Sequence, residues 1–315
     1  TIHYTDGAGA SFTLMKTADL TLPPDSWTPV TDPADQPLTP GSFTITPAGN
    51  TLTTGNITAT SGRAVLSGVN GVAQNVGTAL NVSELNAQSS LGAVNLGNAT
   101  NQVGSLFLGS GATGFTLVDS TGGLTLTGTA SGGSGLTSIT TGGGDLAVNN
   151  PVTGTGVTLV TNGSGNIALG ANVNAGAGTA TLISAAGITQ TGGIITANSL
   201  TGSSGGIVNL PSANPIVSLG AFTSSGGFTL HNTGGLAVNG AVSDSTGPIA
   251  ITVVAGGSLG IVGGGSLTGV GTTLTTGVGN ILLNGGNVNA GSGVATLTSA
   301  LDISQSSGTL TAATL

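Results

Sequence analysis

Two stretches of the chain carry nearly the same sequence. Residues 165–182 read GNIALGANVNAGAGTATL, and residues 279–297 read GNILLNGGNVNAGSGVATL. The match continues downstream, because Ile188 and Gln190 recur as Ile303 and Gln305, each 115 positions later. Self-similarity at a fixed period indicates a repeat architecture, in which each unit stacks on its neighbours and shares their core.

The repeat extends over most of the chain. Residues 114–128, GFTLVDSTGGLTLTG, match residues 227–240, GFTLHNTGGLAVNG, at an offset of 112 or 113 positions. A more diverged copy, FTLMKTADLTL, covers residues 12–22. The chain therefore holds close to three copies of one unit of 113 to 116 residues, at approximately 12–114, 115–227 and 228–315.

Apolar segments of three to six residues alternate with Gly, Asn, Ser and Thr, which favour turns because Gly and Asn accept positive φ. The 59 Gly residues argue against helices, since each would cost a helix about 1 kcal/mol. Short strands, tight turns and a long repeat together predict an all-β fold. We expect a parallel β-helix, or β-solenoid, with about 19 residues per coil; six such coils, or five of about 23, would fill one repeat unit.

The elements GNIxLxxxNVNAGxGxATL, GIxQTGGxITAxSLTGSSG and FTLxxTGGLxVxG resemble the repeats of filamentous-haemagglutinin-like exoproteins. The resemblance covers nearly the whole chain. It implies a right-handed parallel β-helix from a large secreted or surface-displayed protein of a Gram-negative bacterium, of the two-partner-secretion adhesin type. The Asn-Pro motifs of the secretion domain of that family are not evident in this sequence, which leaves the export route open.

Composition restricts the partners of the chain. Two basic residues, Lys16 and Arg63, stand against ten acidic residues, giving a net charge of −8. Because a phosphate backbone is bound through several Lys or Arg side chains, we expect no nucleic acid partner. No membrane insertion is expected either, since the uncharged stretch 250–271 is rich in Gly, Ser and Thr. The absence of Cys excludes a disulfide framework.

One segment departs from the repeat. Residues 23–47 contain seven of the eleven Pro residues and the single Trp. Pro removes a donor from a β-ladder, so we expect a loop or cap excursion here, between a first β-helical segment at 1–22 and a continuous solenoid at 48–315. The excursion either covers the open end of the core or contacts a subunit or ligand. Its candidate contact residues are Pro24, Trp27, Asp32 and Asp35.

No catalytic, cofactor or metal site is expected. Ser204 and Ser258 lie in G-x-S-x-G patterns, but such matches arise by chance in a chain this rich in Gly, and no strand–helix elbow is predicted. His3 and His231 are the only histidines. The remaining carboxylates are too scattered along the chain to predict a glycosidase pair. Asn-x-Ser/Thr sequons leave glycosylation open; they lie at Asn56, Asn81, Asn98 and Asn162.

The sequence thus predicts an extracellular structural protein without enzymatic activity, either a fibre segment or the stalk of an adhesin. The chain starts and stops within a repeat unit, so it is either a piece of a longer exoprotein or a subunit that joins its own copies head to tail. A host or matrix glycan is a further candidate partner. Threonine pairs such as Thr125 and Thr127 leave ice binding as another alternative, although they do not recur at one phase.

Overall fold

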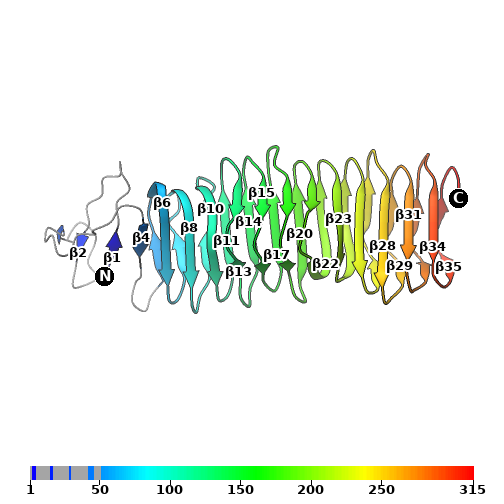
Figure 1. Ribbon diagram of the computed structural model, residues 1–315, viewed down its shortest axis with the longest axis horizontal. Helices are drawn as coiled ribbons and strands as arrows, with labels where there is room; N and C mark the ends of the chain where they lie inside the picture. The colour runs from blue at the N-terminus through cyan, green and yellow to red at the C-terminus, as the bar shows by residue number, and fades with distance from the viewer. Residues whose placement is uncertain (1, 5–14, 17–27, 30–41, 46–50) are drawn as a thin grey trace.

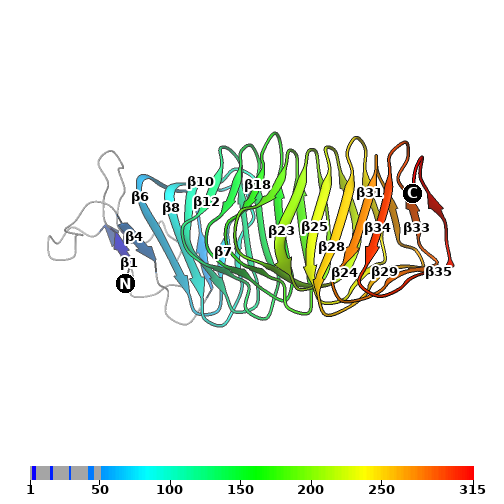
Figure 2. The ribbon, with the colours of Figure 1, turned by 45° about the vertical axis from the view of Figure 1, so that its right-hand side comes forward.

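The structure is a computed structural model that describes residues 2–4, 15–16, 28–29, 42–45 and 51–315. These residues form strands and turns and no helix. From β6 onward the chain winds along one long axis, with its C-terminal strands at the far end of the rod (Figures 1 and 2). The predicted all-β parallel β-solenoid is therefore confirmed. The candidate contact residues Pro24, Trp27, Asp32 and Asp35 lie outside the described residues.

The strands are short, and most contain two to five residues. In chain order they are β1 (Ile2–Tyr4), β2 (Met15–Lys16), β3 (Thr28–Pro29), β4 (Ser42–Ile45), β5 (Leu52–Thr54), β6 (Ile57–Gly68), β7 (Val72–Gln74), β8 (Leu80–Ser89), β9 (Val94–Leu96), β10 (Gln102–Gly111), β11 (Phe115–Asp119), β12 (Leu124–Leu126), β13 (Ala130–Ser131), β14 (Thr137–Thr141), β15 (Leu146–Val148), β16 (Val152–Thr153), β17 (Val157–Thr161), β18 (Ile167–Leu169), β19 (Val173–Asn174), β20 (Thr179–Ser184), β21 (Ile188–Gln190), β22 (Ile195–Ser204), β23 (Val208–Asn214), β24 (Ile216–Ser224), β25 (Phe228–Thr233), β26 (Leu236–Val238), β27 (Ala241–Asp244), β28 (Ile249–Ala255), β29 (Leu259–Val262), β30 (Ser266–Thr268), β31 (Thr272–Thr276), β32 (Ile281–Asn284), β33 (Asn287–Asn289), β34 (Ala295–Ser299), β35 (Ile303–Ser307) and β36 (Leu310–Thr311).

Each turn of the solenoid stacks in parallel on the next. Strands β14, β15 and β16 pair in register with β17, β18 and β19, one turn later. About 12 turns of about 21 residues each result, and at about 4.8 Å per strand they extend over roughly 55–60 Å. The expected 19 residues per coil is too short, because the three corners between β11 and β14 hold four, three and five turn residues.

The parallel stack begins inside the proline-rich part of the sequence. Strand β4 (Ser42–Ile45) pairs in parallel with β6, and β1 pairs antiparallel with β4. Strands β2 and β3 form a separate antiparallel pair. Solenoid pairing thus starts before residue 48, where the continuous solenoid was expected to begin.

The stacked strands form three columns. Column 1 contains β9, β11, β14, β17 and β20; column 2 contains β12, β15, β18, β21, β23 and β25; column 3 contains β13, β16 and β19. Two columns merge where a strand is long. Strand β10 pairs with both β12 and β13, while β22 pairs with both β19 and β20. After β24 this merged strand separates again into β26 and β27.

The sequence repeat is not a whole number of turns. Five successive parallel pairings join, in order, Val94, Phe115, Thr137, Val157, Ala180 and Leu200. The sequence counterpart of Val94 is Val208, which lies one strand further along, in column 2. One repeat therefore equals five turns plus one strand, and each copy is displaced by one column. Both divisions expected from the sequence were wrong, because they assumed that the unit closes after complete coils.

Inward side chains form one apolar core along the described turns. Column strands such as β14 and β17 alternate buried and partly exposed residues, with Val, Leu, Ile and Ala pointing inward. The interior is narrow, and two of the buried phenyl rings lie opposite a glycine. A Cβ at Gly109 would lie 2.4 Å from the ring of Phe115, and one at Gly202 would lie 2.9 Å from the ring of Phe222. This constraint explains why the chain contains so few aromatic residues.

Candidate functional site in the first repeat copy

Two buried amide pairs occupy matching places in the first two repeat copies. Asn101 accepts the backbone N–H of Leu80 (2.9 Å) and bonds both ends of the Gln74 amide (2.6 and 3.1 Å). In the next copy Asn214 accepts the N–H of Ile195 (2.7 Å) and bonds both ends of the Gln190 amide. Both Asn side chains are fully buried. Because every polar atom of these Asn side chains is paired, we assign both pairs to the stability of the fold.

Asp119 is the carboxylate among the described buried groups that have an unpaired polar atom, the others being the Thr54 and Thr272 hydroxyls and Asn86 Oδ1. It ends β11 and is fully buried. Its Oδ1 accepts the backbone N–H of Val103 at 2.8 Å, whereas its Oδ2 has no hydrogen-bond partner in the structure. Burial raises the pKa of Asp119 to about 6, against smaller lowering effects of the Val103 and Ser120 backbone groups. A carboxylate with one free oxygen is costly in an apolar core.

Asp244 lies in the same column, yet its environment is different. The column from Asp119 to Asp244 continues through buried hydroxyl residues, namely Thr141, Thr161, Ser184, Ser204 and Ser224. Asp244 accepts the Ser224 hydroxyl at 2.6 Å and the N–H of Gly227 at 2.8 Å, with further N–H donors from its own turn. Burial raises the pKa of Asp244, but these hydrogen bonds outweigh burial and hold the pKa below its usual range.

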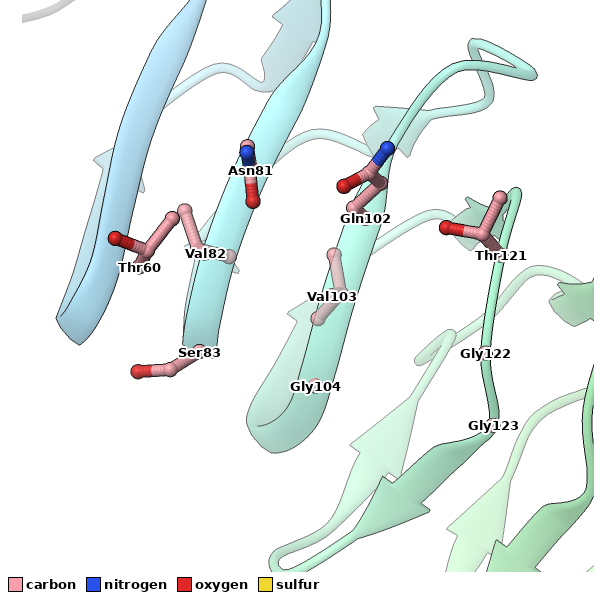
Figure 3. Close-up of a pocket in the computed structure, with 10 residues that line it drawn as sticks. All are labelled: Thr60, Asn81, Val82, Ser83, Gln102, Val103, Gly104, Thr121, Gly122 and Gly123. Carbon is pink, nitrogen blue, oxygen red and sulfur yellow. The ribbon is translucent and has the colours of Figure 1, made fainter.

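A polar groove lies on the outer surface above Val103. It has a volume of about 260 Å³ and is open to solvent. Two amides and a hydroxyl line it, from Asn81 of β8, Gln102 of β10 and Thr121 of the following turn (Figure 3). Its lining also includes the glycines Gly104, Gly122 and Gly123, which have no side chain. The lining residues include no charged side chain, so the groove offers neutral hydrogen-bonding groups across three turns.

A charged cluster lies on the same strands. Arg63 of β6 forms an ion pair with Glu84 of β8, and its guanidinium lies over the ring of Phe107 of β10, 3.9 Å from the centroid. Phe107 is the extra residue of a β-bulge and is 40% exposed. Bulges re-aim side chains and are frequent next to binding sites.

The second repeat copy lacks these surface features. At the positions of Asn81, Gln102 and Gly104 it has Thr196, Pro215 and Val217. Thr179, Ser199 and Gly220 stand where the first copy has its Arg63, Glu84 and Phe107 cluster. The buried amide pairs are kept in both copies, whereas the groove and the cluster are not. This contrast separates residues that the fold requires from residues that only the first copy carries.

The residues considered from the sequence are dispersed. Ser204 is buried and donates to the Ala186 carbonyl, Ser258 Oγ accepts the N–H of Asn280, and His231 of β25 stands in register with Thr252 of β28. Among the sequons, the Asn56 and Asn98 side chains bond the backbone of adjacent turns. Asn81 lies in the groove, which no sequence pattern singled out.

Outward hydroxyl groups stack in column 1. Thr116, Ser138, Thr158, Thr181 and Thr201 stand in register over five turns. The neighbouring outward row contains Val118, Val160 and Ile183, so threonine pairs do not repeat along this column. Ice binding stays a prediction.

Comparison with models of protein families, with curated proteins and with solved structures returns no match. Among the described residues no helix is long and apolar enough to cross a membrane. The same residues contain no group of three or more His, Cys, Asp or Glu side chains placed to hold a metal ion.

Proposed function

We propose that the chain is a rigid segment of a secreted or cell-surface bacterial protein, either a fibre segment or an adhesin stalk of the filamentous-haemagglutinin-like type. The observation that carries this proposal is the single apolar core that runs through about 12 stacked turns. In such a rod each turn contacts only its neighbours, so length is gained by adding turns without redesigning the core. The repeat sequences that resemble exoprotein repeats support the same function.

Head-to-tail association is part of this proposal. In the last turn Leu301, Ile303 and Leu315 are exposed, and an apolar hollow of about 320 Å³ is lined by Ala295, Leu297 and Leu310 together with Ile303 and Leu315. A further turn, either from a longer form of this protein or from a second copy of this chain, would cover these side chains and pair the edges of β34, β35 and β36. Unpaired strand edges are templates for such pairing.

Electron microscopy and small-angle scattering of the purified chain test both parts. Rods that lengthen with protein concentration support self-association, and an Ile303→Glu variant should then remain as single rods. The matched control is Val217→Glu, because Val217 is 60% exposed on the side of the rod, away from the last turn. Rods of fixed length at every concentration would overturn self-association, while a compact particle would overturn the rod itself.

A second candidate function is binding of a neutral glycan in the groove of the first copy. Its support is the chemistry of the lining, in which amide, hydroxyl and backbone groups face solvent without a charged neighbour (Figure 3). Sugar hydroxyls suit such donors and acceptors, and the exposed glycines let a ligand approach the backbone. A glycan array compares the chain with Asn81→Thr/Gln102→Ala, and with Asn209→Ala on β23 as control. Equal binding by the chain and the double variant would exclude the groove.

A further inference from the structure

The second and third repeat copies contain a matched pair of buried residues that differ by one group. Asp119 of β11 and Asn232 of β25 follow the same FTL sequence, and both side chains are fully buried. Asp119 Oδ1 accepts the N–H of Val103 at 2.8 Å, and Asn232 Oδ1 accepts the N–H of Ile216 at 3.0 Å. Each bond spans 16 residues, so one half of each side chain has the same role.

The other half differs in its hydrogen bonding. Asn232 Nδ2 donates to the carbonyl of Ile216 at 2.9 Å, with longer contacts to the carbonyls of Thr233 and Gly234. A carboxylate oxygen cannot donate, and Asp119 Oδ2 has no partner. Protonation would turn Oδ2 into an O–H donor, as the amide is in Asn232.

We propose that under mildly acidic conditions Asp119 holds a proton in the folded chain and acts as a proton-operated latch between β11 and β10, beneath the groove of the first copy. With the proton, Asp119 is the hydrogen-bonding equivalent of Asn232. Without it, a buried negative charge lies next to Val103, the residue whose N–H it accepts and which lines the groove. The latch is thus placed where loss of the proton would disturb the candidate binding surface.

Within the part of the chain that the structure describes, no charged group near Asp119 offers a different explanation. The strands that pack against β11 are β9, β10 and β14, and none of them contains an ionisable side chain. Asp145 follows β14, but its carboxylate is exposed and bonded to Asn166. Arg63 is paired with Glu84. Burial is therefore what raises the pKa of Asp119 to about 6.

The direction of the pH effect follows from this shift. A carboxyl group whose pKa is higher in the folded than in the unfolded chain contributes its stability at low pH. That contribution falls as pH rises from the ordinary value of 3.8 through about 6. Each pKa unit corresponds to a tenfold change in an equilibrium constant. The equilibrium constant for opening around β11 should therefore rise about a hundredfold across this range.

Three chains test the latch: the natural sequence, Asp119→Asn and Asn232→Asp. Hydrogen exchange of the Val103 N–H is measured from pH 4.5 to 8 and corrected for the intrinsic pH dependence of exchange. Because measurement starts at pH 4.5, above the ordinary pKa of 3.8, the natural chain should lose roughly thirtyfold protection. Asp119→Asn should lose none, and Asn232→Asp should acquire a similar loss at Ile216. Equal pH profiles for the natural chain and Asp119→Asn would overturn the proposal.

A direct titration covers the case in which Asn232→Asp fails to fold. The carboxyl carbon of Asp119 is followed by NMR in the natural chain, with exposed Asp302 as internal reference. A midpoint near 6 is the expected result. A midpoint near 4 would show that the folded chain does not favour the protonated carboxyl over the unfolded chain, and would exclude the latch, whatever becomes of the proposed rod or groove.

Discussion

Replacing Asn214 by leucine keeps the branching of the side chain, puts two larger methyl groups in place of the amide oxygen and nitrogen, and removes five hydrogen bonds from the core. Asn214 accepts from Ile195 N–H and Gln190 Nε2, and it donates to Gln190 Oε1 and to the carbonyls of Ser212 and His231. Gln190 keeps bonds to Gly193 and Ser212, so the N–H of Ile195 is the group left without any partner. A buried unpaired donor costs about 1–3 kcal/mol, and the weakened amide adds to it. We expect Asn214→Leu to lower the free energy of unfolding by about 3–5 kcal/mol.

The double variant Gln190→Met/Asn214→Leu makes the reasoning specific. Once Asn214 is gone, Gln190 is a buried amide with incomplete bonding, so removing it as well should recover about 1–2 kcal/mol. Both variants are compared by urea unfolding and by hydrogen exchange at Ile195. The control is Asn209→Leu on the outer side of β23, which should change stability by no more than about 0.5 kcal/mol. If the two core substitutions were simply additive, the amide pair would not be an energetic unit.

Three other substitutions probe the core, a corner and a buried carboxylate. Leu159→Ala should lower the free energy of unfolding by about 2–5 kcal/mol in urea titrations, because Leu159 is fully buried between turns; a change below about 1 kcal/mol would contradict close packing. Gly193 and Gly256 have φ of +60° and +58°, but a Cβ at Gly193 would lie 2.2 Å from the Ala171 carbonyl carbon, whereas Gly256 has open space. Gly193→Ala should therefore lower the melting temperature clearly more than Gly256→Ala. The pKa of Asp244 is held below its usual range, so its contribution is present at neutral pH and is lost in acid. The melting temperature of Asp244→Asn should therefore fall less between pH 6 and pH 3 than that of the natural chain, and an equal fall would refute this assignment.

The fold class could be predicted from the sequence, whereas the number of residues in each turn of the solenoid could not. Apolar triplets such as Ile167–Leu169, separated by Gly and Asn, could only be short strands, and the repeat made parallel stacking the natural arrangement. The length of a turn was hidden because the repeat adds one strand to five full turns. The period of a sequence repeat gives the spacing between equivalent residues. It does not show in which column of strands each repeated segment lies.

The candidate site was harder to predict for a different reason. Asn101 and Asn214 recur within the aligned copies, so their buried role was detectable as a polar residue kept at a repeat position. The groove depends on side chains from three turns that only stacking brings together, such as Asn81 and Gln102. Asp119 continues the two-residue alternation of Phe115 and Leu117, which places it on the inward face, but a charged residue is not expected in an apolar core.

Each repeat copy is displaced by one column, so the conformation of a corner must be determined by contacts with the adjacent turn and not by its column. Asn56, Asn172 and Asn287 occupy the same repeat position, and each accepts a backbone N–H one turn later, from Ala79, Ile194 and Thr309, at 2.8, 3.0 and 2.9 Å. Those three N–H groups precede β8, β22 and β36, which belong to different columns. The same bond therefore forms at three different corners of the rod. This hydrogen bond requires only a backbone N–H in the adjacent turn, so a repeat copy can fold in any column. The outward residues of each copy are then free to differ.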